Sequence, residues 1–134
     1  MSNPIVLIAE DDTDTRDVIR KLLESEGFIV IGAEDSMLAL SALGSVRPDV
    51  ILVDIMMPGV DGIGLIRWIR ANPDSRLIPI IAMTAYGNFH LRQAEKAGAN
   101  IGIAKPEQIP DLPEIIHHLI GNGRSGSKQS ANSH

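Results

Sequence analysis

Five short runs of consecutive apolar residues restrict the fold of this chain more than any other feature of its sequence. They are Ile5–Ala9, Phe28–Ala33, Val50–Val53, Ile78–Met83 and Ile101–Ala104. A strand with one wet face alternates apolar and polar residues, whereas a continuous apolar run suits a strand that is covered on both faces. The runs therefore predict a parallel sheet between two layers of helices.

Segments with helical periodicity separate the apolar runs. They are Asp14–Glu26, Ser36–Leu43, Ile63–Ala71 and Asn88–Ala97, with a fifth that starts near Asp111. The first stops before Gly27, a residue type that readily ends a helix. Because crossovers between parallel strands are right-handed, five βα units predict an α/β fold, the doubly wound (βα)5 flavodoxin-like three-layer sandwich with sheet order 2-1-3-4-5.

Length and composition limit the number of domains and the classes of partner. A chain of 134 residues suits one domain, which we place at residues 1–121; residues 122–134 are rich in Gly, Ser and Asn and are predicted to be a flexible tail. A net charge of -5 without basic clusters argues against direct nucleic-acid binding. The apolar runs are too short to cross a membrane, and a chain without cysteine fits the cytoplasm.

Acidic residues follow two of the predicted strands. Glu10 and Asp11 come directly after the first apolar run, and Asp54 comes directly after the third. In the predicted order these strands are neighbours, so their carboxyl ends should bring the carboxylates together where doubly wound sheets place their sites. Clustered carboxylates repel one another unless a cation binds them, and Mg²⁺ prefers oxygen ligands. The sequence therefore predicts a magnesium site.

Thr84 and Lys105 occupy the corresponding positions after the fourth and fifth apolar runs. A carboxylate nucleophile, a divalent metal, a hydroxyl donor and an ammonium group together meet the needs of phosphoryl transfer to an aspartate, because that reaction depends on positioning and on neutralising the phosphoryl oxygens. Asp54 is the predicted nucleophile.

The remaining predictions concern packing and helix capping. Asp12 is assigned as the cap of the first helix rather than as a metal ligand. Trp68 is expected to be half-buried. Methionine adapts to irregular gaps in a core, and four residues are predicted to pack in this way: Met37, Met56, Met57 and Met83.

Taken together and in order, these motifs resemble the receiver domains of response regulators in two-component signalling, in particular single-domain regulators of the chemotaxis type. The resemblance covers residues 4–120. It is carried by Glu10-Asp11, Asp54, the turn from Met56 to Gly62, Thr84-Ala85 and Lys105-Pro106. It implies a signalling phosphoacceptor rather than an enzyme, with a histidine kinase or phosphotransfer protein and a downstream target protein as partners.

The resemblance also assigns roles to individual residues. It implies that Asp11, Asp54 and the backbone carbonyl of Met56 bind Mg²⁺ directly and that Glu10 acts mainly through water. It implies a cis peptide bond before Pro106, which would aim Lys105 into the site. A dimer through the fourth helix, fifth strand and fifth helix is a further expectation that it raises.

Three positions bear on how this chain differs within that family. Many receivers have Tyr or Phe where this chain has Gly102, so the aromatic switch of the family is missing. Met56 and Tyr86 stand two residues beyond Asp54 and Thr84, where the family borders the path of the hydrolytic water. Both side chains are bulky and are predicted to slow loss of the phosphoryl group.

Two other functions fit parts of the same pattern. An aspartate-nucleophile phosphatase of the haloacid dehalogenase type needs a second acid two residues after the nucleophile, and Met56 stands there instead. A receiver-like module that binds partners without being phosphorylated is the other alternative. The complete set of acidic, hydroxyl and lysine groups argues against it.

Overall fold

The five apolar runs form one parallel sheet in the computed structural model, which describes residues 3–57 and 61–121. The strand order is β2-β1-β3-β4-β5, and every pairing is parallel. The strands are β1 (Ile5–Ala9), β2 (Ile29–Ala33), β3 (Val50–Asp54), β4 (Ile80–Thr84) and β5 (Ile101–Ala104). The predicted order 2-1-3-4-5 is confirmed.

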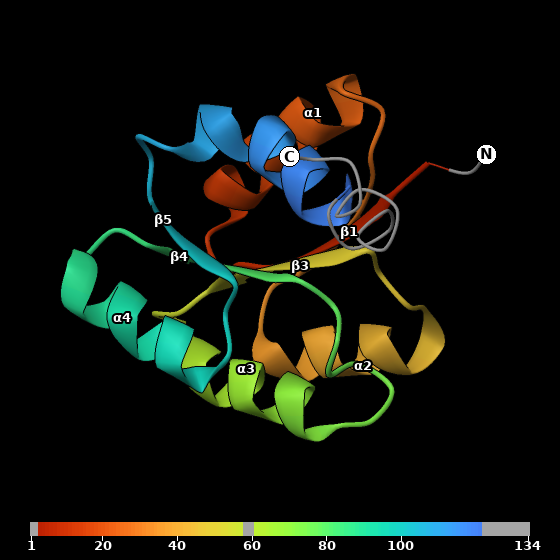
Figure 1. Ribbon diagram of the computed structural model, residues 1–134. Coiled ribbons are helices and arrows are strands. Elements are labelled where there is room, and N and C mark those ends of the chain that lie inside the picture. Colours follow the sequence, from red (N-terminus) through yellow and green to blue (C-terminus); the bar gives the residue numbers. More distant parts are fainter. Residues whose placement is uncertain (1–2, 58–60, 122–134) are drawn as a thin grey trace, which may run out of the picture.

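Helices cover both faces of the sheet (Figure 1). They are α1 (Thr13–Ser25), α2 (Ser36–Ser45), α3 (Gly62–Ala71), α4 (Asn88–Ala97), the short 3-10 turn η1 (Ile109–Asp111) and a final helix at residues 112–121. One face carries α2, α3 and α4, and the other carries α1 and the final helix, drawn in blue. Pro113 lies in the first turn of that final helix, as predicted.

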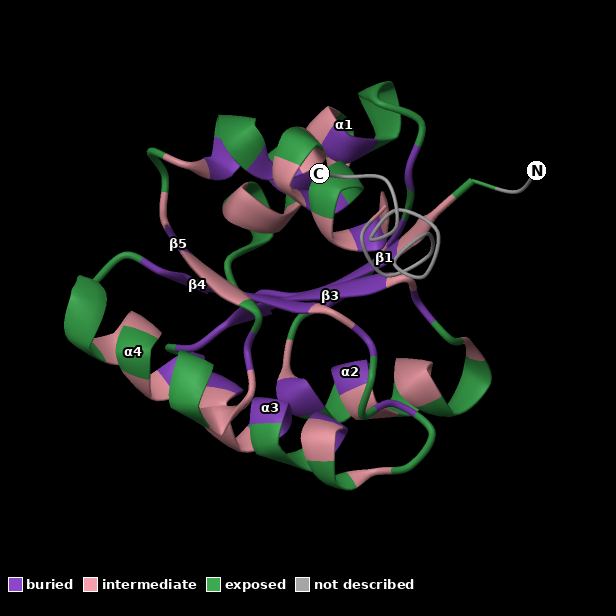
Figure 2. Cartoon of the chain, viewed as in Figure 1, coloured by how far each residue is buried: buried purple, intermediate pink, exposed green. Residues whose placement is uncertain are grey.

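Alternation along the strands divides the core into two halves. Leu7 and Ile51 point to the face covered by α2, α3 and α4, whereas their neighbours Ile8 and Leu52 point to the face covered by α1 and the final helix. All four side chains are fully buried, and the central strands are buried along their length (Figure 2). This burial on both faces explains why the strands are continuous apolar runs.

Aspartates begin three of the helices. Asp12, Asp35 and Asp61 each accept a hydrogen bond from the backbone N–H three residues on, at 2.8, 2.8 and 2.6 Å, and so cap α1, α2 and α3. The cap predicted for Asp12 is confirmed. Helix α4 differs, because its N-cap is Gly87, which has no side chain to accept such a bond.

Two strand boundaries and two methionines differ from the sequence predictions. β4 starts at Ile80 because the Ile78 amide closes a turn onto the Ser75 carbonyl. β2 starts at Ile29 because the amide of Phe28 bonds to the Leu23 carbonyl at the end of α1. Met57 and Met83 are buried as predicted. The prediction was wrong for Met37 and Met56, which are exposed because the helix turns the first outward and the loop turns the second outward.

The described part of the chain contains no helix long and apolar enough to cross a membrane. The tail predicted at residues 122–134 lies outside the described residues, as does the middle of the turn after Asp54, at residues 58–60.

Candidate phosphoryl-transfer site

The ends of the three central strands bring the predicted acidic and hydroxyl residues to one edge of the sheet. Asp54 is the last residue of β3 and Thr84 is the last residue of β4, while Glu10 directly follows β1. Because β1 and β4 flank β3, these residues lie side by side. Glu10, Asp54 and Thr84 are all buried. The parallel sheet therefore places buried polar groups at the carboxyl ends of its three central strands, next to the apolar core.

Three carboxylates meet at this edge. One oxygen from each of Glu10, Asp11 and Asp54 lies within 4.8 Å of the other two. Glu10 and Asp54 are 0% and 4% exposed, whereas Asp11 is exposed. Three close carboxylate oxygens, two from buried residues and one from an exposed residue, are a donor set that suits a hard divalent cation such as Mg²⁺. The residues present therefore fit the predicted metal.

Lys105 enters the cluster from the end of β5. Its Nζ donates to Glu10 Oε1 at 2.7 Å and to Asp54 Oδ2 at 3.3 Å. The peptide bond between Lys105 and Pro106 is cis. Burial lowers the pKa of Lys105, but the hydrogen bond to Glu10 and the Asp54 charge outweigh burial and raise this pKa overall. The ammonium group therefore stays charged and is shared between two carboxylates.

Glu10 carries the largest electrostatic cost in the cluster. Burial first, and then the hydrogen bond to Asp54, raise the pKa of Glu10 to about 7, against the opposing effect of Lys105. The raised value means that the folded protein binds a proton on Glu10 more tightly than the unfolded chain does. The cluster is thus held at a cost in stability.

This cost predicts a pH-dependent effect of replacing Glu10 with glutamine in the metal-free protein. Because the folded pKa lies above the ordinary 4.5, the stability linked to Glu10 is present at low pH and is lost as the pH rises through 7. Glu10→Gln removes this loss. Thermal melts with a chelator should coincide near about pH 5 and favour the variant by a few degrees near about pH 8. A difference that is the same at both pH values would contradict the assignment.

Backbone amides hold Asp54 and Thr84 in place. Asp54 Oδ1 accepts a hydrogen bond from the Met56 amide at 3.0 Å, and Thr84 Oγ1 accepts one from the Tyr86 amide at 3.0 Å. The Thr84 carbonyl accepts from the Lys105 amide at 2.9 Å. The side chains of Met56 and Tyr86 are 45% and 65% exposed, so both lie at the surface beside the site.

Sequence reasoning missed two supporting residues. Arg16 Nη1 donates to the Glu10 carbonyl at 2.7 Å and so fixes the backbone of the acidic pair. Gln108 Oε1 accepts from the Ala104 amide at 2.7 Å and closes the turn that carries Lys105. The only signal in the sequence was position. Arg16 stands one helical turn after the Asp12 cap, and Gln108 stands three residues after Lys105.

Gly102 lies on β5 directly beneath a side chain of α4. A Cβ atom added at this glycine would be 2.9 Å from Leu91 Cδ2 and 3.1 Å from Leu91 Cβ. Leu91 therefore occupies the space next to the position where many receivers carry an aromatic residue. The absence of a side chain at Gly102 lets α4 approach β5 closely.

Comparison with known proteins gives consistent matches over this fold. Residues 6–117 match the family model described as the response regulator receiver domain. An uncharacterized 14.6 kDa protein from Leptolyngbya boryana is 41% identical over 83% of this chain and 86% of that protein. The polar-differentiation response regulator DivK from Brucella anthropi is 31% identical over 87% of this chain and 96% of its own length.

Solved structures agree with the sequence matches. The receiver domain of the sensor histidine kinase PA1611 from Pseudomonas aeruginosa, which has a magnesium ion coordinated in its active site cleft, superposes with a TM-score of 0.82. It is 34% identical and is matched over 90% of this chain and 99% of that domain.

Proposed function

Because the chain belongs to the response regulator receiver domain family, we propose that Asp54 accepts a phosphoryl group from a histidine kinase or phosphotransfer protein. The observation that carries the proposal is the contact of one buried carboxylate, Asp54, with Lys105 Nζ at 3.3 Å, beside Glu10 and Asp11. An aspartate that only formed a turn at the end of a strand would need none of these neighbours. The phosphorylated form then changes the contacts made with a downstream protein.

In the proposed reaction an oxygen of Asp54 attacks the phosphorus atom. The O–P bond forms while the P–N bond to the donor histidine breaks, and the imidazole leaves with the electron pair. The Lys105 ammonium and the Thr84 hydroxyl donate to the phosphoryl oxygens, and buried surroundings strengthen both interactions. Asp11, Asp54 and the Met56 carbonyl would hold Mg²⁺, with Glu10 acting through water. When bound, that ion supplies positive charge that neutralises the phosphoryl oxygens.

Incubation with magnesium and acetyl phosphate, followed by intact-mass measurement, tests the proposal. The parent should gain the mass of one phosphoryl group, Asp54→Asn should gain none, and Asp35→Asn should behave as the parent because asparagine also caps a helix. A parent that never gains this mass would support the unphosphorylated binding module instead. Steady turnover of varied phosphate esters would support the phosphatase.

Met56 and Tyr86 are proposed to set the lifetime of the phosphoryl group. Both side chains are exposed beside the site, and we expect their bulk to hinder water that approaches in line with the O–P bond. The phosphorylated parent should therefore lose its phosphoryl group several-fold more slowly than the Met56→Asn, Tyr86→Ala double variant. Decay followed by intact mass after removal of the donor measures this, and equal rates would reject the role.

Helix α4 is proposed to transmit the signal. It has no side-chain cap, it buries only Ala94, and it is flanked by two glycines with positive φ, Gly87 at 84° and Gly98 at 131°. The Thr84 hydroxyl that would turn toward the phosphoryl group also accepts from the Tyr86 amide in the loop before α4. Movement of the Thr84 hydroxyl toward the phosphoryl group would break this bond and release the loop. The contact of Leu91 with Gly102 would then take the place of the family's aromatic switch.

Amide chemical shifts with and without beryllofluoride, a phosphoryl mimic, test this route. We expect the largest changes at residues 84–97, with smaller changes on β2, which lies at the far edge of the sheet. Changes confined to β5 and residues 112–121 would contradict it. The dimer through α4, β5 and the final helix stays a prediction.

A further inference from the structure

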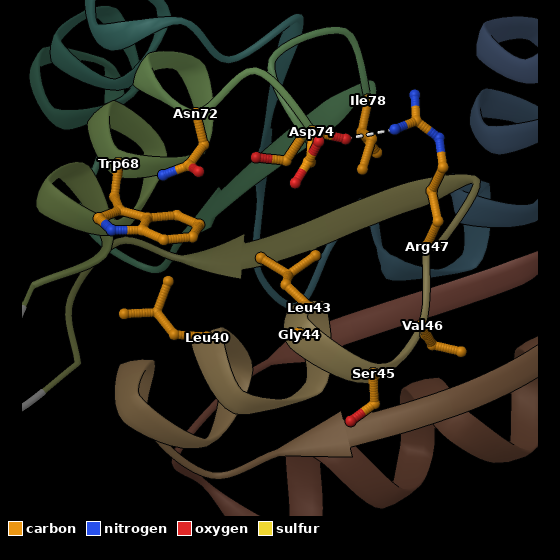
Figure 3. Close-up of a pocket in the computed structure, with 11 residues that line it drawn as sticks. Leu40, Leu43, Gly44, Ser45, Val46, Arg47, Trp68, Asn72, Asp74 and Ile78 are labelled. Atoms are coloured by element: carbon orange, nitrogen blue, oxygen red, sulfur yellow. Dashed lines mark hydrogen bonds between the residues drawn. The ribbon is translucent and has the colours of Figure 1, made fainter.

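A groove separates α2 from α3 on the face of the sheet that they share (Figure 3). Its volume is about 610 Å³. Trp68 of α3 and Leu40 of α2 face each other across it, with Leu43 further along. By contrast, Arg70 on the opposite side of α3 bonds to the Gly98 carbonyl at the end of α4, so that side is closed. The groove is open to solvent; its lining is apolar where Trp68 and Leu40 face each other and polar toward Arg47 and Asp74.

The outer surface of α2 adjoins this groove and carries no charge. The helix has the sequence SMLALSALGS and no titratable side chain. Met37 is 66% exposed and Leu38 is 47% exposed. Met37 lies one turn before Leu40 on α2 and protrudes outside the residues that line the groove. The exposed surface of α2, with the 41% exposed Trp68, forms an apolar patch of the kind that marks contact sites.

The other described helices all expose charged side chains. Examples are Asp17 on α1, Arg67 on α3, Lys96 on α4 and Glu114 on the helix at residues 112–121. This contrast matters for self-association. In a two-fold dimer the same patch faces itself, so any charge near the axis meets its own copy and is repelled. Within a chain of net charge -5, the ten residues of α2 add no such repulsion.

We propose that the α2/α3 patch is the contact surface of a weak, two-fold dimer of this chain, with Met37 of each copy entering the groove beside Trp68 of the other. The patch is suited to this because it contains both a protruding apolar side chain and a cavity, and a two-fold contact requires one surface to supply both. Methionine and tryptophan are also residue types enriched in interfaces.

Charges at the end of the groove are compatible with the same arrangement. Arg47 donates to the backbone carbonyl of Asp74, and neither the Arg47 guanidinium nor the Asp74 carboxylate forms an ion pair within the described residues. A two-fold contact offers each group an opposite charge on the other copy. Such rim charges favour the correct register more than they add affinity.

Trp68 is the only tryptophan of the chain, so its fluorescence reports on the groove alone. The test uses the full chain without magnesium or phosphodonor, which keeps it separate from the proposed phosphorylation. Sedimentation should show the mean mass rising from 14.4 kDa toward twice that value as the concentration passes about 100 µM, as expected for a small interface. Tryptophan emission should shift to shorter wavelength over the same range.

Matched variants assign the surface. Met37→Glu changes an exposed side chain and places like charges at the two-fold contact, so it should weaken the dimer at least about 10-fold and abolish the emission shift. Phe89→Glu makes the same kind of change on α4, which belongs to the alternative dimer through α4, β5 and the final helix, and it should leave the α2/α3 dimer intact. The proposal is overturned if the parent stays monomeric up to about 1 mM. It is also overturned if Phe89→Glu breaks the dimer and Met37→Glu does not.

Discussion

Replacing Lys105 with methionine is expected to lower the melting temperature of the metal-free protein by about 8 °C near about pH 8, a loss of about 2 kcal/mol in the free energy of unfolding. The ammonium group lies 2.7 Å from Glu10 and 3.3 Å from Asp54, and its side chain is 14% exposed. Methionine keeps the length of the side chain but leaves three carboxylates without a cation.

The size of this effect follows from burial. Removing one partner of a fully buried ion pair costs about 3–5 kcal/mol because the other charge is left uncompensated. Asp11 is exposed, so water reaches the cluster and relieves part of that cost, and we take a smaller figure. The loss should shrink near about pH 5, because Glu10, with its pKa of about 7, binds a proton there and needs no partner.

Two comparisons separate this explanation from ordinary loss of packing. Asp54→Asn removes one negative charge from the same cluster and should raise the melting temperature of the metal-free protein. Magnesium should restore much of the stability lost in Lys105→Met, since it supplies positive charge to the same oxygens. A Lys105→Met loss that is unchanged by both pH and magnesium would contradict the idea that the ammonium charge stabilises the carboxylates.

The carboxylate cluster was predictable because the positions of strand-end residues follow from the order of the strands and do not depend on how side chains pack. Once β1 and β3 are neighbours, Glu10 and Asp54 must meet at their carboxyl ends, and the order of the strands follows from general rules of connection. The contact between Lys105 and Glu10 joins residues 95 positions apart, yet the same rule brings β5 to that edge.

Other features depend on tertiary packing that no local pattern encodes. Met37 was predicted to pack in the core, but α2 buries Ser36 and Ala39 and turns Met37 outward, where it is exposed. The contact of Leu91 with Gly102 depends on how α4 settles on β5. Arg16 reaches the Glu10 carbonyl only because α1 folds back beside β1.

Gly62 provides the second large prediction, because the start of α3 lies against the strand end that carries Asp54. A Cβ atom added at Gly62 would be 2.4 Å from Ile55 Cα and 2.5 Å from the Asp54 carbonyl oxygen. Both neighbours are backbone atoms, which cannot rotate away as a side chain could. Gly62→Ala should therefore force α3 away from β3 and cost about 3 kcal/mol, or about 12 °C in melting temperature.

Gly44→Ala is the matched control for that measurement. Gly44 also lies in a helix, but nothing stands within 4 Å of an added Cβ atom, so alanine should stabilise the protein by up to about 0.5 kcal/mol through its better helix propensity. The displaced helix in Gly62→Ala should also disturb the backbone between Asp54 and α3, including the Met56 amide that bonds Asp54 Oδ1. Magnesium titrations should therefore show weaker binding in Gly62→Ala and unchanged binding in Gly44→Ala. Equal stability of the two variants would mean that α3 does not begin against Asp54, because only that close approach distinguishes the two glycines.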